Sequence, residues 1–271
     1  MHLLPLILYA AAAAAYVVHF AWRDPRVGRM ATATLGAGIL SHTFLIGMQT
    51  VTVGHAPLVG TTAVLSAFVW LLGLSYLYVE LTTEERAMGL FVTILLVVLY
   101  LIPALDPTVS PRPPLLRSPL FTIHVVSMLF AYASFALGCV LGITYVLLFN
   151  EIKAKHLGYF YARLPSLQTL DVMNGRVVTI GWICLTLGIA IGGIWATQIH
   201  QSPDPRAQAM SVGDPKILVA LVSWALYSFA VFARRVGWSG RRAAVLSTVG
   251  FVIVLLNLVP VGYFLTKSHN F

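Results

Sequence analysis

Charged side chains are scarce in this sequence. Of its 271 residues only 10% are Asp, Glu, Lys or Arg, whereas 59% are hydrophobic. A soluble domain carries roughly 25% charged residues, so this composition excludes an ordinary soluble protein. Several apolar runs approach the roughly 20 residues that cross a bilayer as a helix. Because a backbone in lipid must pair its own polar groups, the sequence predicts an all-α, polytopic membrane protein.

Cysteines and the motifs of several enzyme classes are also scarce or absent. Cys139 and Cys184 lie in separate apolar runs and form no CxxC, which argues against thiol redox chemistry. No HExxH, GxSxG or phosphate-binding glycine loop is present, so hydrolytic and nucleotide-binding functions lack support. The net charge of +8 comes without a basic run interleaved with aromatics, and nucleic-acid binding is not expected. A solute transporter is disfavoured because paired intramembrane charges and inverted repeats are not evident.

Eight apolar segments follow one another along the chain. We expect membrane-spanning helices at residues 3–21, 31–53, 62–81, 89–102, 120–149, 177–196, 217–232 and 243–265. Six prolines from Pro103 to Pro119 predict a non-helical connector. The polar stretch 150–176 predicts the largest loop. The prediction is one bundle of eight transmembrane helices over residues 1–271, without a separate soluble domain.

Two pairs of glycines lie four residues apart in the fifth and sixth segments, Gly138 with Gly142 and Gly188 with Gly192. Small residues at this spacing let helix backbones approach closely, but they can also simply be tolerated in lipid. The sequence leaves both interpretations open.

The distribution of basic residues predicts the orientation in the membrane. Twelve Lys and Arg residues fall after odd-numbered segments and five fall on the other side. Basic residues collect in cytoplasmic loops, so both termini are expected outside the cytoplasm. His124, the loop 197–216 and His269 would then share the outer face.

Histidines are the candidate ligands, because imidazole suits iron, copper or zinc and a pair of imidazoles suits haem iron. His124 and His269 are predicted on one face, although their spacing in the sequence does not show that they meet. His42 lies about mid-depth in the second segment, where polar groups are costly and face the bundle interior. It is either an interhelical hydrogen-bonding residue or an internal ligand or relay, and the sequence does not distinguish these roles.

Several segments carry a family resemblance. They are LPSLQTLD at 164–171 with Arg176, LTLGI at 185–189, GIWA at 193–196, and Asp214-Pro215-Lys216. Together with His124 and Tyr132, they resemble the CcsA/ResC branch of the haem-handling cytochrome c assembly family. The resemblance covers essentially the whole chain.

This resemblance implies a site on the outer face. In the family, a tryptophan-rich outer loop cradles haem and two flanking histidines ligate the iron; here they correspond to His124 and His269. Trp195, Asp214 and Pro215 would contribute to the haem-binding surface, and haem b is the implied cofactor. Implied partners are a CcsB/ResB-like membrane subunit and apocytochrome c, and the implied location is the bacterial plasma (inner) membrane.

The outer loop also departs from the family pattern. Ser211, Val212 and Gly213 precede Asp214-Pro215-Lys216, where the family has Trp-x-Trp. The pattern is more similar to the HemX type of the same superfamily. That type implies an alternative function, namely regulation of haem biosynthesis at the level of glutamyl-tRNA reductase, acting through the cytoplasmic stretch 150–176 without stable haem. A complete cytochrome c synthase is not expected from this chain alone.

Overall fold

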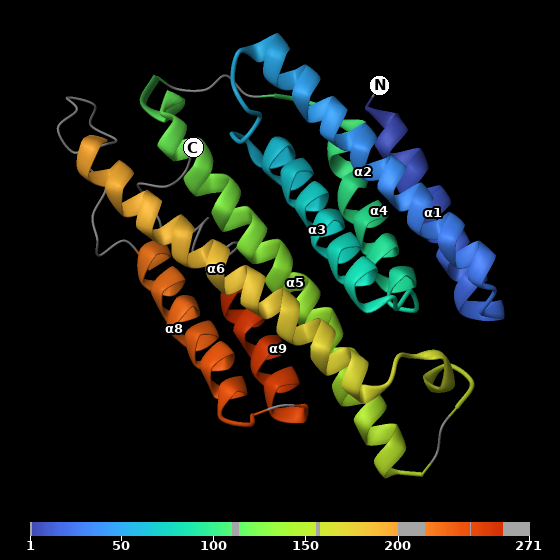
Figure 1. Ribbon diagram of the computed structural model, residues 1–271. Helices are drawn as coiled ribbons and strands as arrows, with labels where there is room; N and C mark the ends of the chain where they lie inside the picture. Colours follow the sequence, from blue (N-terminus) through green and yellow to red (C-terminus); the bar gives the residue numbers. More distant parts are fainter. Residues whose placement is uncertain (1, 110–113, 156–157, 200–214, 239, 257–271) are drawn as a thin grey trace.

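The computed structural model describes residues 2–109, 114–155, 158–199, 215–238 and 240–256. In this part of the chain the structure is helical, without strands (Figure 1). The α-helices are α1 (Leu3–Trp22), α2 (Pro25–Val53), α3 (Thr61–Thr83), α4 (Gly89–Leu105), α5 (Pro119–Lys153), α6 (Leu167–Ile199), α8 (Pro215–Arg235) and α9 (Arg241–Leu256). Two short 3-10 helices, Pro114–Arg117 and Tyr161–Arg163, precede α5 and α6. The all-α prediction is confirmed for these residues.

Six of these helices are long and apolar enough to cross a membrane, namely α1, α2, α3, α5, α6 and α8. The apolar helix α4 has 17 residues, which corresponds to roughly 26 Å at 1.5 Å per residue. The described part of α9 has 16 residues, and the rest of the eighth predicted span lies outside the described residues. The protein is therefore a multi-pass membrane protein with six candidate spanning helices among its described residues.

The helices form two groups that meet along α3 and α5 (Figure 1). Helices α1 to α4 pack together around buried tyrosines, and α5, α6, α8 and α9 form the second group. Ser75 of α3 and Ser134 of α5 are both buried, and their hydroxyl oxygens lie 3.3 Å apart at the junction. The two groups are thus joined by side-chain packing and by polar contact.

The polar stretch before the sixth span is only partly a loop. We expected this span to begin at Val177, but α6 begins at Leu167. Ser166 caps the helix by accepting a hydrogen bond from the backbone N–H of Thr169. Polar residues in the first turns are used for contacts between helices: Asn174, only 2% exposed, donates to the Gly138 carbonyl and to Ser247. The expected loop 150–176 is therefore helical at both ends.

Prolines also mark helix ends differently from the prediction. The second span was expected from Ala31, but α2 begins at Pro25, with Asp24 capping it through the Arg26 N–H. Pro119 opens α5, because proline is tolerated where the N–H would have no helical partner. Pro103 lies inside α4, near its end. The connector from Pro103 to Pro119 is therefore helical at both of its ends.

A buried carboxylate links three helices of the first group. Glu80 of α3 is 1% exposed and accepts hydrogen bonds from Tyr16 of α1, at 2.6 Å, and from Thr32 of α2. Arg86, in the turn before α4, lies 3.8 Å from the same carboxylate. Because a buried charge is costly unless it is paired and hydrogen-bonded, these contacts fix how the helices meet.

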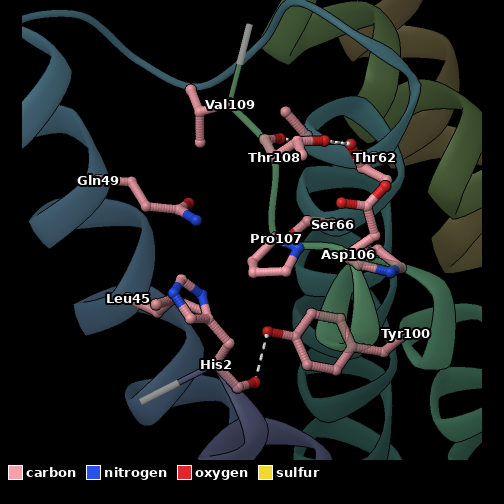
Figure 2. Close-up of a pocket in the computed structure, with 12 residues that line it drawn as sticks. His2, Leu45, Gln49, Thr62, Ser66, Tyr100, Asp106, Pro107, Thr108 and Val109 are labelled. Carbon is pink, nitrogen blue, oxygen red and sulfur yellow. Dashed lines mark hydrogen bonds between the residues drawn. The ribbon is translucent and has the colours of Figure 1, made fainter.

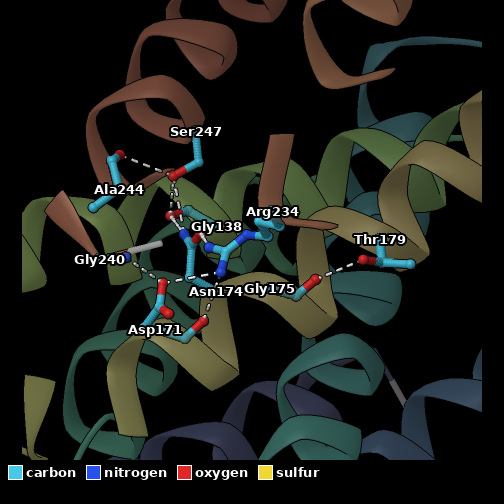
Figure 3. A network of polar contacts seen from close by, with 9 residues as sticks. All are labelled: Gly138, Asp171, Asn174, Gly175, Thr179, Arg234, Gly240, Ala244 and Ser247. Carbon is cyan, nitrogen blue, oxygen red and sulfur yellow. Dashed lines mark hydrogen bonds and ion pairs between the residues drawn. The ribbon is translucent and has the colours of Figure 1, made fainter. Parts of the chain in front are cut away.

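A second polar network links α6, α8 and α9 (Figure 3). Arg234 forms a 2.9 Å ion pair with Asp171 and donates to the Asn174 side-chain oxygen at 2.8 Å. The Asp171 carboxylate also accepts the backbone N–H of Gly240 at 3.0 Å. Asp171 was expected in a loop, but it lies on α6 and holds the turn between α8 and α9.

The turns that follow α1, α3 and α5 lie at one end of the bundle. Arg23 donates to the Ala162 carbonyl, and Arg163 donates to the Ala21 carbonyl. Arg176 of α6 donates to the Thr82 carbonyl near the end of α3. This arrangement is the one expected when successive helices cross in alternating directions.

Glycines allow the closest helix contacts. A Cβ atom at Gly142 of α5 would lie 2.6 Å from the backbone oxygen of Ala244 in α9. A Cβ atom at Gly188 of α6 would lie 2.8 Å from the Met128 sulfur in α5. The close-approach interpretation of the glycine pairs is thus confirmed at these positions.

Replacing Gly142 with alanine is expected to destabilise the protein. The added methyl group would force α5 and α9 apart, which costs about 1–3 kcal/mol. The matched control is Gly47→Ala on α2, where an added Cβ meets nothing within 4 Å. Thermal unfolding in detergent, followed by size-exclusion chromatography, should give a lower midpoint for Gly142→Ala only. Equal midpoints for the two variants would contradict the packing of α5 against α9.

Candidate functional site

His124 lies in the second turn of α5, which begins after the capping residue Ser118. Its Nδ1 atom lies 2.7 Å from the Gly188 carbonyl oxygen on α6. A carbonyl only accepts hydrogen bonds, so Nδ1 carries the proton and the lone pair of the neutral ring is on Nε2. A metal-binding histidine whose Nδ1–H is held in this way ligates through Nε2. His124 is therefore a residue that could ligate haem iron.

The imidazole of His124 occupies space that glycine leaves on α6. A Cβ atom at Gly192 would lie 2.6 Å from His124 Nδ1, closer than van der Waals contact permits. One turn earlier, Gly188 makes room for Met128 of the same α5 face. The second glycine pair thus positions the histidine as well as bringing the two helices together.

An apolar cluster lies beside His124, one turn nearer the end of the bundle. Trp195 of α6 is 4% exposed and packs against Phe121 of α5, with ring centroids 5.2 Å apart. Val59 and Leu116 complete the cluster. Among the described residues, no hydrogen-bond acceptor lies within reach of the Trp195 indole N–H. A buried indole N–H usually has a partner, so this donor is an unusual feature of the cluster.

Pro215 is the first residue of α8. Two hydrogen bonds join α8 to α6, from Trp224 to Thr186 at 2.9 Å and from Trp182 to Ser228 at 2.7 Å. Both bonds fit one antiparallel register. Extending that register by nine residues along each helix brings Pro215 level with Trp195. His124, Trp195 and Pro215 therefore lie at the same end of the bundle, whereas Asp214 and His269 lie outside the described residues.

His42 is fully buried between helices of the first group. Its Nδ1 lies 3.0 Å from the Tyr9 hydroxyl and its Nε2 lies 2.9 Å from the Ser66 hydroxyl. The Tyr100 ring packs against it, with centroids 4.5 Å apart. Both ring nitrogens are engaged, so interhelical hydrogen bonding accounts for a histidine at this depth. A ligand role for His42 stays a prediction.

Ser66 also lines a small polar pocket at the end of the first group (Figure 2). The pocket has a volume of about 10 Å³, and His2, Gln49 and Asp106 face it. The Tyr100 hydroxyl donates to the His2 carbonyl at its edge. Sequence reasoning missed this pocket, because its residues come from four separate segments and share no motif.

Known proteins resemble this chain over most of its length. A family model described as "Cytochrome C assembly protein" matches residues 58–269, which include His124, Trp195, Pro215 and His269. This is most of the chain. The chain belongs to the cytochrome c assembly protein family. Membership makes it a membrane protein of cytochrome c biogenesis and confirms the resemblance found in the sequence.

Curated relatives of this cytochrome c assembly protein carry the name "Cytochrome c biogenesis protein CcsA". The protein of Trieres chinensis is 26% identical over 261 residues, which cover 84% of this chain and 81% of the relative. The protein of Chlorella vulgaris is 27% identical over 270 residues, covering 87% and 84%. The similarity therefore extends across both helix groups. Assignment to the HemX type stays a prediction.

The structural role of His42 can be tested through Tyr9. Tyr9→Phe removes one hydroxyl and leaves a buried nitrogen without that partner, which should cost about 0.5–2 kcal/mol. Tyr78→Phe is the control, since the Tyr78 side chain is 48% exposed. Denaturant titration in mixed micelles should show the loss for Tyr9→Phe and a change within about 0.5 kcal/mol for the control. Equal stability of both variants would show that the bond contributes nothing.

Proposed function

We propose that this protein handles haem during cytochrome c biogenesis and binds it at the outer face through His124 and His269. The observation that carries the proposal is the His124 ring, whose Nδ1 is held by the Gly188 carbonyl so that Nε2 is the ligating nitrogen. His269 supplies the second imidazole. Two neutral imidazoles give low-spin iron and hold haem without changing its porphyrin.

The proposed topology has eight spans with both termini outside the cytoplasm, in a bacterial inner membrane. The excess of basic residues after odd-numbered spans supports this orientation. The hydrogen bonds that join the turns after α1, α3 and α5 agree with it, because they gather the same basic loops at one end. His124 and Trp195 then lie toward the outer surface.

Each residue of the proposed site has a distinct role. His124 and His269 would each supply one imidazole to the iron. Trp195 and Phe121 supply an apolar base beside His124, and Trp195 also brings a buried indole N–H. Pro215, the first residue of α8, and Asp214, which precedes it in the sequence, would contribute to the haem-binding surface. Haem b is the cargo, passed on to an apocytochrome c with a CcsB/ResB-like subunit as the membrane partner.

The proposal predicts the absorption spectrum of the purified full-length protein loaded with haem. Wild type should show the bands of low-spin, bis-histidine haem, and these should be lost in His124→Ala and in His269→Ala. His55→Ala is the matched control, since His55 lies on the same predicted face and has its Nδ1 3.1 Å from the Ala56 carbonyl. The control should keep the wild-type spectrum.

Unchanged spectra in both His124→Ala and His269→Ala would contradict the proposal. The regulatory hypothesis would then be the better account. It stays a prediction, and it requires a cytoplasmic partner that is lost when the stretch 150–176 is altered.

A pair of neighbouring glycines offers a test that leaves every histidine in place. Gly192→Ala should displace the His124 ring, because the new Cβ would lie 2.6 Å from Nδ1. Gly193→Ala should leave haem affinity unchanged, because an added Cβ meets nothing within 4 Å there. Haem titration followed by absorbance should show that Gly192→Ala binds haem at least about ten-fold more weakly than wild type, as expected when the support of a metal ligand is lost. The same affinity in both variants would argue against His124 as the ligand.

A further inference from the structure

A groove lies at the other end of α6, far from His124 along the helix. It has a volume of about 380 Å³ and lies between α3, α6 and α8. Its lining includes Tyr78 of α3, Val172, Arg176, Thr179 and Ile180 of α6, and Arg234 of α8. In the proposed topology, this is the cytoplasmic end of the bundle. The family assignment does not require a site here.

Two arginines define the polar end of this groove. Arg234 lies along the backbone of α6, where a Cβ at Gly175 would be 3.2 Å from its Nη1 atom. It is fixed there by Asp171 and Asn174 (Figure 3). The Asp171 carboxylate offsets its charge, but the guanidinium, with five N–H groups, keeps further donating capacity.

Arg176 supplies the unbalanced charge. Its Nη1 donates to the Thr82 carbonyl at 2.7 Å, which orients the guanidinium across the space between α3 and α6. Within the described residues, no carboxylate lies within ion-pair distance of Arg176; the pairs found there are Arg86 with Glu80 and Arg234 with Asp171. The polar end of the groove is therefore suited to an anion.

The rest of the groove is mainly apolar, and two of its side chains are partly exposed. Tyr78 is 48% exposed and Val172 is 43% exposed. Ile180 continues the same lining about two turns beyond Val172 on α6, which in the proposed topology is toward the membrane interior. A ligand that fits this surface has an anionic head beside Arg176 and an apolar chain along Val172 and Ile180.

We propose that the groove binds one anionic phospholipid of the cytoplasmic leaflet, with its phosphate beside Arg176. Basic pockets between membrane helices on the cytoplasmic side recognise anionic lipid head groups through this chemistry. A lipid held here contacts α3, α6 and α8 at once. It would reinforce the junction between the two helix groups at the end opposite to the haem site. This inference rests on the proposed topology but not on haem binding.

Native mass spectrometry of the full chain tests the proposal. The protein is transferred to micelles with equal amounts of phosphatidylglycerol and phosphatidylcholine, and retained lipids are counted. Wild type should retain phosphatidylglycerol selectively, and Arg176→Gln should lower that retention by about five-fold, as expected for one Arg near an anionic head group. Arg235→Gln removes the same charge near the end of α8 from a residue outside the groove and should leave the retention unchanged.

A second variant separates lipid binding from folding. Ile180→Trp fills the apolar part of the groove without altering charge and should also lower retention, while circular dichroism and gel filtration stay as in wild type. His124→Ala should keep the lipid, so failure of the haem proposal would not affect the result. Equal retention of the two lipids, or equal losses in Arg176→Gln and Arg235→Gln, would overturn the proposal. Haem added to the lipid-loaded protein should leave the lipid in place. If haem displaces the lipid, and Arg176→Gln then fails to bind that haem, the groove binds haem and the lipid proposal is wrong.

Discussion

The close antiparallel contact between α5 and α6 is the constraint on which the rest of the structure depends. These are the longest described helices, with 35 and 33 residues. Gly188 and Gly192 of α6 make room for side chains of α5, and Gly142 of α5 lets α9 approach. In lipid, helices gain little from burying apolar surface, so such contact and interhelical hydrogen bonds carry the association. The same contact brings the Gly188 carbonyl to His124, so one contact between helices determines both the fold and the position of the His124 ring.

Buried polar groups determine how the other helices join this pair. Glu80 connects α1, α2 and α3, whereas Asp171, Asn174 and Arg234 connect α6 to α8 and α9. Each group would be costly in a bilayer if it lacked partners, so each permits few alternative arrangements. The contacts of Glu80 and Asp171 lie toward the end of the bundle opposite to His124, whereas the described residues packed around Trp195 are apolar and aromatic.

Much of the fold could be predicted from the sequence, because long apolar runs in a membrane protein have few alternatives to helix. The beginnings of α2 and α6 could not. Leu167 to Arg176 is too polar to predict as part of a span, yet it is helical, because Asn174 and Asp171 find their partners on other helices. Hydropathy measures the cost of transferring a side chain from water into lipid, and it carries no information about hydrogen-bonding partners on other helices.

The candidate site was predictable only in part. His124, Trp195 and Pro215 were identified from a resemblance, and the structure brings them to one end of the bundle. The bond from His124 to Gly188 could not be read from residues 64 positions apart, and neither could the arginine groove, whose residues come from three helices. His269 and Asp214 lie outside the described residues, so their part in the site stays a prediction.

The central claim is that two histidine nitrogens bind one haem iron at the outer face. Pulsed electron paramagnetic resonance of the full-length protein, labelled with ¹⁵N-histidine and loaded with ferric haem, tests it most directly. The account predicts hyperfine coupling of a low-spin iron to two labelled nitrogens, and to one in His124→Ala. Coupling to no histidine nitrogen, or couplings unchanged when His124 is replaced, would contradict it.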